Sequence, residues 1–354
     1  MNKKTAVALL FGGRSAEHDV SIASARAIHK NLDPVKFEVV SIFINREGRW
    51  RRTASPEMSD GELAEGDFHD FLPWGRVQAE ALRADIYFPV LHGPSGEDGT
   101  IQGLLELADA PYVGAGVLGS AVGMDKAVMK ELFRSRGLPI VNHRVILETD
   151  WSLRPGAIAR ALRRGFRPPL FVKPANLGSS VGITKVKGWD ALGPAVATAL
   201  RFDRKAIVEQ GVAGREIECG VLGNDAPEAS LPGEVIPHRE YYDYADKYLD
   251  GKTSFAIPAR LPAPLVRRIR RLAVEAFRAC DCAGLARIDF FLEAKTGRLY
   301  VNEINTIPGF TEISMYPKLW AVSGLAFGPL VERLIELGFE RHRVRRRAVD
   351  RDPT

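Results

Sequence analysis

Two short stretches near the carboxyl end of the 354-residue chain constrain its fold more than any other feature. Residues 284–294 (GLARIDFFLEA) and 298–305 (RLYVNEIN) alternate apolar and polar residues, the pattern of a strand with one buried face. The tripeptide KTG at 295–297 joins them, and a three-residue connection ending in Gly is typical of a hairpin with a bulge. The sequence therefore predicts an antiparallel hairpin, ended by the Pro-Gly pair at 308–309.

Polar residues meet across the two strands of this hairpin. If it is symmetric about Thr296, Asp289 faces Glu303 and Arg287 faces Asn305, and a bulge would shift this register by one residue. Carboxylates directly opposite each other repel, so either water screens them on an exposed sheet face or a cation lies between them. Carboxylate and amide oxygens favour Mg²⁺ or Mn²⁺, and Mg²⁺ usually accompanies nucleotide phosphates.

Composition narrows the class of protein. The chain is 45% hydrophobic and 26% charged, as in ordinary globular proteins, and its length predicts two or three domains. A net charge of +5 suits anionic small substrates but is too weak to indicate nucleic acid. The basic stretch 341–351 has no interleaved aromatics, which favours a solvated helix end over a nucleic-acid arm. Three cysteines without a CxxC pair, no signal-peptide pattern and no apolar run of about 18 residues predict a cytoplasmic protein.

The first 120 residues alternate strands and helices. Strands are predicted at 5–11, 37–44, 84–93 and 111–116, and helices at 19–32 and 101–109. This order predicts a parallel, doubly wound sheet, whose ligands bind beyond the carboxyl ends of its strands. GGRSAEH (12–18) and HGPSGEDG (92–99) fall at those ends, and the polar segment 51–75 is predicted to be a surface insertion.

From about residue 121 the pattern changes to short strands between helices, with helices at 124–137 and 264–281 and a last one near 322–338. FVKPANLGSSVGITKV (171–186) is a candidate phosphate cradle, because Lys173 precedes a small-residue turn whose amides could form an anion nest. It lacks the Walker A pattern, and an ordinary Gly-Ser hairpin is the alternative.

Two further stretches fit a nucleotide site. Glu209 and Glu216, in 206–220, offer an acceptor for an adenine amine and a carboxylate for ribose hydroxyls, although surface glutamates are the alternative. YYDYADKYLDGKT (241–253) predicts a mobile lid that carries Lys247 and Tyr248, and a plain surface loop is its alternative.

Together, the motifs HGPSGEDG, FVKPANLGSSVG, EQGVAGREIE, YYDYADKY, GLARIDF and NEINTIPGFT resemble those of the ATP-grasp superfamily and, more narrowly, of the D-alanine–D-alanine ligase family. They occur in the family's order over about 5–335. The resemblance implies a three-domain α/β ATP-grasp fold. Residues 1–120 would form a Rossmann-like, substrate-binding domain, and 121–215 and 216–354 two α+β domains that clamp ATP, the last with the metal site.

The resemblance also implies an activity. It is the ATP-dependent joining of two D-alanines into D-alanyl-D-alanine through an acylphosphate, with release of ADP and phosphate, for peptidoglycan precursors. The implied cofactors are ATP and two Mg²⁺ or Mn²⁺ ions. The implied partners are small molecules and a second copy of the chain in a homodimer, with no nucleic acid or membrane.

Matched to the family's motifs, individual residues take implied roles. The metal ligands are Asp289, Glu303 and Asn305, with Glu303 bridging both ions. The ATP contacts are Lys126, Lys173, Glu209, Val212, Glu216 and Lys247. Glu17 and His92 bind the first substrate's ammonium, and Ser314 binds the second substrate's carboxylate. The catalytic set is Glu17, Ser179, Tyr248, Arg287 and Gly309, the last two stabilising the oxyanion and the first three closing the lid.

One residue departs from the family's motifs, and three other functions compete with the ligase interpretation. Gln210 stands where many relatives carry Lys, which changes little if only its backbone meets adenine. A ligase that makes D-Ala–D-lactate or joins other amino acids is the nearest rival, and Tyr248 argues against the lactate-forming relatives. A nucleotide-binding regulator would be expected to lack a metal ligand or Arg287, and all are present. A nucleic-acid-binding protein has only the basic tail in its favour.

Overall fold

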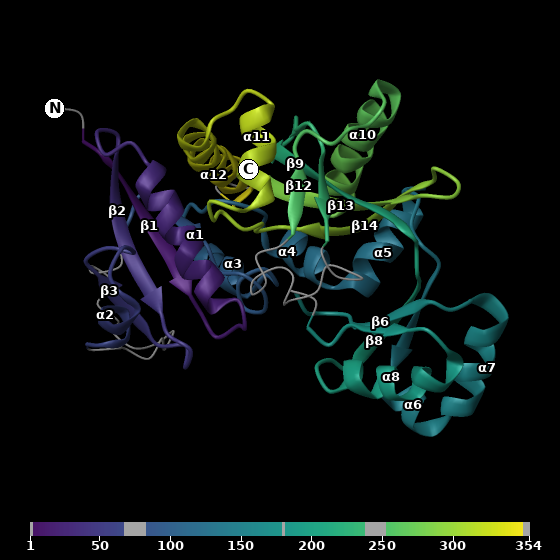
Figure 1. Ribbon diagram of the computed structural model, residues 1–354. Helices are drawn as coiled ribbons and strands as arrows, with labels where there is room; N and C mark the ends of the chain where they lie inside the picture. The colour runs from purple at the N-terminus through teal and green to yellow at the C-terminus, as the bar shows by residue number, and fades with distance from the viewer. Residues whose placement is uncertain (1–2, 67–82, 179–180, 238–252, 350–354) are drawn as a thin grey trace, which may run out of the picture.

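The computed structural model describes residues 3–66, 83–178, 181–237 and 253–349. Ser179, Lys247 and Tyr248 therefore lie outside the described residues, as does the predicted lid except for Thr253. The described chain forms three sheets, which Figure 1 shows as a purple unit at the left, a teal unit at the lower right and a green-to-yellow unit at the top.

The first sheet has the order β3-β2-β1-β4. Its strands are β1 (Thr5–Gly12), β2 (Phe37–Ile44), β3 (Trp50–Thr53) and β4 (Ile86–Pro89), and its helices are α1 (His18–Asn31), α2 (Asp60–Ala64) and α3 (Thr100–Leu107). β1 pairs in parallel with β2 and β4, as the continuous apolar run of β1 predicts, and only the edge strand β3 is antiparallel. The predicted doubly wound architecture is confirmed.

Two predictions for this region were wrong in detail. Residues 111–116 contribute only a single parallel bridge, between Tyr112 and Tyr87, because Gly114 takes a left-handed φ of +101° that interrupts an extended strand. The predicted insertion 51–75 contains most of β3 and all of α2, whose capping box on Ser59 and Glu62 fixes the start of that helix.

The second sheet has the order β5-β8-β6-β7 and is antiparallel throughout. Its strands are β5 (His143–Leu147), β6 (Leu170–Pro174), β7 (Thr184–Val186) and β8 (Lys205–Gln210). The helices α6 (Glu148–Leu153), α7 (Pro155–Gly165) and α8 (Leu192–Leu200), with the 3₁₀ turn η1 (Trp189–Ala191), cover it. Leu162, Val196 and Val208 lie in its fully buried core.

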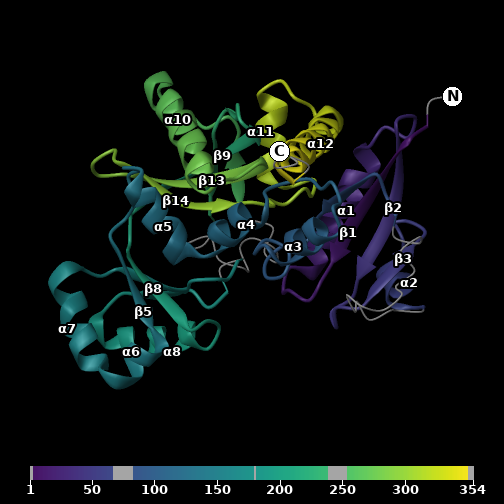
Figure 2. The same ribbon diagram turned by 180° about the vertical axis from the view of Figure 1, so that it is seen from behind.

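The third sheet has the order β12-β11-β9-β13-β14, with β10 on β9. Its strands are β9 (Gly214–Gly223), β10 (Glu228–Ala229), β11 (Gly233–Ile236), β12 (Ser254–Ala256), β13 (Gly284–Glu293) and β14 (Leu299–Asn305). Helices α5 (Lys126–Ser135) and α10 (Ala263–Ala279) pack on it through one apolar core, and α4 (Val117–Met124) precedes α5. From behind, α5 lies beside β14 and α10 beside β13 (Figure 2).

The chain ends in two helices, of which the last was predicted near 322–338. α11 (Met315–Val322) and α12 (Phe327–Val349) are separated at Gly324, whose φ of +97° stops the first. α12 then packs on the first sheet, where Leu330 and Leu334 share a core with Val7. Residues 341–349 of the basic stretch continue this helix, and Arg341 stacks on Tyr112 with its guanidinium carbon 3.9 Å from the ring centre.

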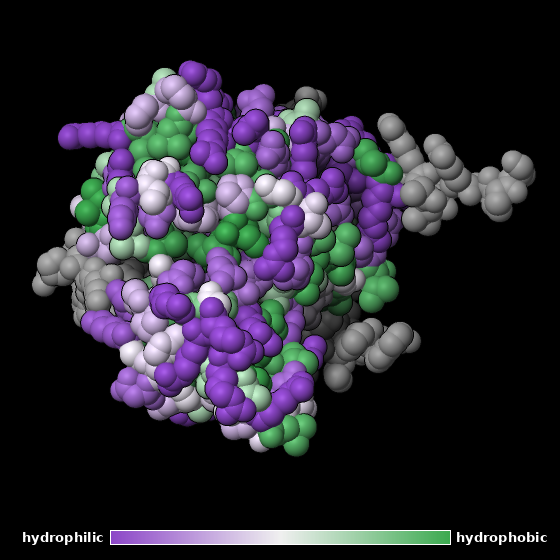
Figure 3. Space-filling view, turned by 90° about the vertical axis from the view of Figure 1, so that its right-hand side faces the viewer, coloured by the Kyte–Doolittle hydropathy of each residue, from purple (hydrophilic) through white to green (hydrophobic). Residues whose placement is uncertain are grey.

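The outer surface is mainly polar on the side drawn in Figure 3, where hydrophobic side chains gather in a band across the middle of the view. Within the described ranges, none of the helices combines the length and the apolar character that a bilayer crossing needs.

Candidate active site

A cavity of about 950 Å³ lies where the three sheets meet, a size in the range of ligand sites. Every predicted site residue that the structure describes lines it. These residues are Glu17, His92, Lys126, Lys173, Glu209, Val212, Glu216, Arg287, Asp289, Glu303, Asn305, Gly309 and Ser314. Residues far apart in the sequence are thus brought to one place.

In the hairpin of β13 and β14, the predicted residue pairs form at the site, although the turn differs from the predicted one. Asp289 pairs with Glu303 and Arg287 with Asn305. At the turn, however, the Glu293 amide donates to the carbonyl of Arg298, so the loop has one residue more than predicted and the strands start one residue out of step. A bulge at Asn302 then restores the predicted pairing.

At the end of the cavity formed by this hairpin, arginine and lysine side chains contact the carboxylates. Arg287 donates from Nε and Nη2 to the two carboxylate oxygens of Asp289, at 2.7 and 2.8 Å. Asn305 Nδ2 also donates to Asp289, at 3.0 Å. Lys126 Nζ lies 3.7 Å from Glu303 Oε2 and donates to the Leu177 carbonyl.

The side chains of Asp289, Glu303 and Asn305 fit a hard divalent cation by their chemistry. Two carboxylates and an amide offer only oxygen ligands, and their positions on neighbouring strands let them share an ion. The third of these residues is an amide, and among the described residues no group of three His, Cys, Asp or Glu side chains is placed to hold a metal ion.

A second part of the cavity is built on a buried carboxylate between two lysines. Glu209 of β8 meets Lys130 Nζ at 2.8 Å and Lys173 Nζ at 2.6 Å. Lys130 also donates to the carbonyl of Asn302 on β14, at 2.8 Å. Burial would raise the pKa of Glu209, but the two lysines outweigh it and hold that pKa well below its ordinary value.

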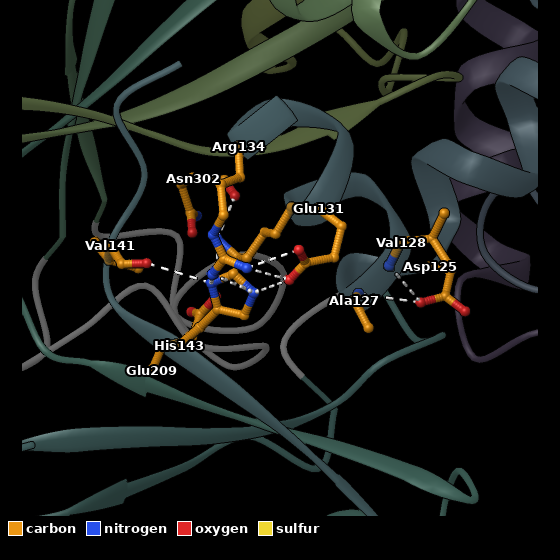
Figure 4. A network of polar contacts seen from close by, with 10 residues as sticks. Asp125, Ala127, Val128, Glu131, Arg134, Val141, His143, Glu209 and Asn302 are labelled. Carbon is orange, nitrogen blue, oxygen red and sulfur yellow. Dashed lines mark hydrogen bonds and ion pairs between the residues drawn. The ribbon is translucent and has the colours of Figure 1, made fainter. Parts of the chain in front are cut away.

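Around this carboxylate, α5 and β5 supply a second layer of polar contacts (Figure 4). His143 of β5 lies 3.3 Å from Glu131, which in turn accepts from Arg134. Burial, followed by the charge of Lys130, lowers the pKa of His143, so the ring is neutral beside the lysines. Asp125 caps the first turn of α5 by accepting from the amides of Ala127 and Val128.

The predicted phosphate cradle follows β6. Asp203 fixes its start by accepting from the backbone and side-chain nitrogens of Asn176, at 2.8 and 2.9 Å. Gly182 has a φ of +72°, and a Cβ there would lie 2.8 Å from both Pro174 and Phe202, so only glycine fits the exit. The Gln210 side chain accepts from the Arg167 amide and donates to the Arg167 carbonyl, and its backbone amide donates to the carbonyl of Asn142.

The third part of the cavity lies at the carboxyl ends of β1 and β4. A Cβ on Gly93 or Gly178 would lie 2.8 or 2.9 Å from Glu17 Oε2, so both glycines make room for this carboxylate. His92 Nδ1 lies 3.0 Å from the Ile307 carbonyl, and Glu97 accepts from the Ile307 amide at 3.0 Å. His92 and Glu97, which follow β4 of the first sheet, thereby hold the loop after β14 in place.

Burial, reinforced by the charge of Glu17, raises the pKa of Glu97 to about 8. Ser314 directly precedes α11, whose first residue is Met315. Its Oγ accepts from the Thr311 amide at 2.9 Å.

Sequence reasoning missed three charged residues of the site. Lys130 follows Lys126 by one helical turn and so shares its face of α5, which was a usable signal. Glu218 follows Glu216 by two residues in a strand and therefore faces the same side. Glu97 lies inside the quoted motif HGPSGEDG but had no assigned role.

Comparison with known proteins agrees with this geometry. Models of the D-ala D-ala ligase N-terminus and C-terminus match residues 6–115 and 132–336. A D-alanine–D-alanine ligase of Solibacter usitatus is 52% identical over 96% of this chain and 97% of its own length. One of Geobacillus thermodenitrificans is 46% identical over 96% of each chain.

Solved structures give the same result. The D-alanine-D-alanine ligase of Coxiella burnetii superposes with a TM-score of 0.82 at 39% identity, covering 98% of this chain and 97% of its own. The VanG D-Ala:D-Ser ligase of Enterococcus faecalis superposes with a TM-score of 0.83 at 32% identity, covering 95% of this chain and 100% of its own. The chain belongs to the D-alanine–D-alanine ligase family.

Proposed function

We propose that the protein is an ATP-dependent ligase that joins two D-alanine molecules into D-alanyl-D-alanine for peptidoglycan precursors, releasing ADP and phosphate. The observation that carries the proposal is one cavity that brings together a lysine-rich end, a carboxylate-rich end and a third part built on Glu17. Similarity over nearly the whole chain to D-alanine–D-alanine ligases of Solibacter usitatus and Coxiella burnetii supports it.

ATP lies between the second and third sheets in this proposal. Lys126, Lys173 and Lys247 contact its phosphates, Glu209 and Val212 flank adenine, and Glu216 binds ribose. Burial lowers the pKa of Lys173 but the charge of Glu209 outweighs it, so the raised pKa keeps Lys173 cationic for a phosphate oxygen.

Asp289, Glu303 and Asn305 would hold two Mg²⁺ or Mn²⁺ ions, with Glu303 shared between them. When bound, the ions neutralise charge on the transferred phosphoryl group. The oxygen-only donor set and its position at the carboxylate-rich end support this assignment.

Glu17 and His92 hold the ammonium of the first D-alanine. Its carboxylate oxygen attacks the γ-phosphorus of ATP, ADP leaves, and an acylphosphate forms. The amine of the second D-alanine, held at its carboxylate by Ser314, attacks the acyl carbon. Arg287 and the Gly309 amide stabilise the resulting oxyanion, and phosphate leaves as the peptide bond forms.

Ser179 and Tyr248 complete a hydrogen-bonded set with Glu17 that closes the lid. We also propose the domain limits 1–120, 121–215 and 216–354, a homodimer, and a cytoplasmic location, where ATP is available.

The experiment is phosphate release from ATP and Mg²⁺ with D-alanine, L-alanine, D-serine plus D-alanine, or D-lactate plus D-alanine, with products identified by mass. Release that requires D-alanine and yields the dipeptide supports the proposal. A mixed product in place of the dipeptide would change the second substrate, as the name of the VanG relative illustrates. Absence of release under all conditions would favour a regulator of the same fold.

A further inference from the structure

A third carboxylate stands in line with the two carboxylates among the predicted metal ligands. β13 pairs Asp289 with Glu303 on one side and with Glu218 of β9 on the other. We call Glu218, Asp289 and Glu303 the carboxylate row. Glu218 lies at the centre of the sheet with a side chain only 7% exposed, less than those of Asp289 (15%) and Glu303 (23%).

A buried carboxylate beside another is unfavourable unless a cation compensates it. Arg287 is that cation, because its Nε lies 3.1 Å from Glu218 Oε2 and 2.7 Å from Asp289 Oδ1. The single hydrogen of Nε is donated to Asp289. One guanidinium therefore serves two carboxylates, of which only Asp289 is a predicted metal ligand.

This arrangement creates a competition. The two oxygens of Asp289 that accept from Arg287 are the same oxygens that an ion at this residue would need. When Asp289 turns to an ion, the guanidinium loses its aligned partner and needs another anion to keep its place in the cavity.

We propose that Glu218 is a positioning residue that holds Arg287 in the site while Asp289 binds the divalent cation. The proposal rests on the proposed function, in which Arg287 stabilises the oxyanion. Without a charged Glu218, Arg287 loses the carboxylate of β9 that lies against its Nε, and an ion that binds Asp289 then competes directly with the guanidinium.

The test is Glu218→Gln, which keeps the size of the side chain and removes its charge. Mn²⁺ binding is measured by electron paramagnetic resonance in the presence of ADP, without turnover. We expect the Mn²⁺ dissociation constant to rise about tenfold, the scale of lost outer-sphere support. The ligation kcat should fall while the KM for D-alanine at the Glu17 end changes little. Glu106→Gln, which removes a carboxylate bonded to Tyr112 in the first unit, is the charge-matched control and should match wild type.

The same change in an Arg287→Met background separates positioning from a general effect of charge. If Glu218 acts through Arg287, Glu218→Gln has no further effect on Mn²⁺ binding there. An equal weakening in both backgrounds would overturn the proposal, as would unchanged Mn²⁺ binding in the single variant. If the Gln variant does not fold, Glu218→Asp takes its place with the same expected direction.

The readout distinguishes this proposal from the proposed function. If the wild-type protein binds Mn²⁺ normally and Glu218→Gln weakens that binding, but no ligation is detected, the ligase assignment is overturned and the proposal for Glu218 stands. A wild-type protein that binds no Mn²⁺ in the presence of ADP would overturn the proposal for Glu218 along with the metal site.

Discussion

The two ends of the cavity have opposite charge balances. At the lysine-rich end, one carboxylate (Glu209) meets two lysines (Lys130 and Lys173), and the formal charges of these three side chains leave one positive charge. At the carboxylate-rich end, the three acids of the carboxylate row lie against Arg287 and Lys126, and the formal charges of these five side chains leave one negative charge. One end thus favours anions and the other favours cations.

The difference extends to burial. The side chains of Lys130 and Glu209 are 1% and 3% exposed, whereas those of Lys126 and Glu303 are 12% and 23% exposed. A buried cluster is fixed when the chain folds, because breaking it leaves a charge without solvent. A partly exposed cluster can exchange its partners, which a site needs when ions bind and products dissociate. The comparison predicts that one end is rigid and the other exchangeable.

The largest effect should follow from removing charge at the exchangeable end. Glu303→Gln removes the charge that we propose is shared by two ions, and we expect kcat to fall about 10³-fold, the upper scale for loss of one electrostatic contact. Phosphate release with saturating ATP, Mg²⁺ and D-alanine measures it. Substantial residual activity would contradict the bridging role.

A pair of lysine variants separates the two ends by their stability. Lys130→Met leaves Glu209 with Lys173 alone and removes the buried hydrogen bond to the Asn302 carbonyl, and we expect a loss of about 1.5–3 kcal/mol in the free energy of unfolding, the scale of hydrogen bonds to charged groups. Lys126→Met, in the same helix, should cost about 1 kcal/mol or less because its partner is partly solvated. Denaturant unfolding of both proteins gives the comparison, and equal losses would refute the difference in burial.

A smaller, pH-dependent effect is expected at the Glu17 end. Because the pKa of Glu97 is raised from 4.5 to about 8 on folding, the folded state keeps a proton that the unfolded state has lost. Stability should therefore fall as pH rises through this window, by at most about 1.4 kcal/mol per pH unit. Unfolding measured from pH 5 to 8 should show a shallower slope in Glu97→Gln, and parallel slopes would exclude a shifted Glu97.

The sequence predicted the arrangement of side chains at the carboxylate-rich end better than at the lysine-rich end. Alternation within two neighbouring strands is a local pattern, so it was enough to place Asp289, Glu303 and Asn305 on one face of the hairpin. The register was right only because the bulge at Asn302 cancels the longer turn, and no residue of the turn indicates that compensation.

Long-range packing explains what the sequence did not predict. The contact of Lys130 with Glu209 joins residues 79 positions apart, and its orientation depends on how α5 lies between the second and third sheets. The return of α12 to the first sheet is likewise decided by the burial of Leu330 and Leu334, not by a local signal. Helices α6 and α7 were not predicted, although α7 begins with a proline at its first position, a typical helix start.

Calorimetric titration of ADP, first without and then with Mg²⁺, tests the opposite charge balance most directly. Lys173→Met should weaken ADP binding under both conditions, because it removes a cation from the lysine-rich end. Glu303→Gln should bind ADP without metal at least as tightly as wild type, and should lose the gain that Mg²⁺ provides. Equal weakening of metal-free ADP binding in the two variants would contradict the account.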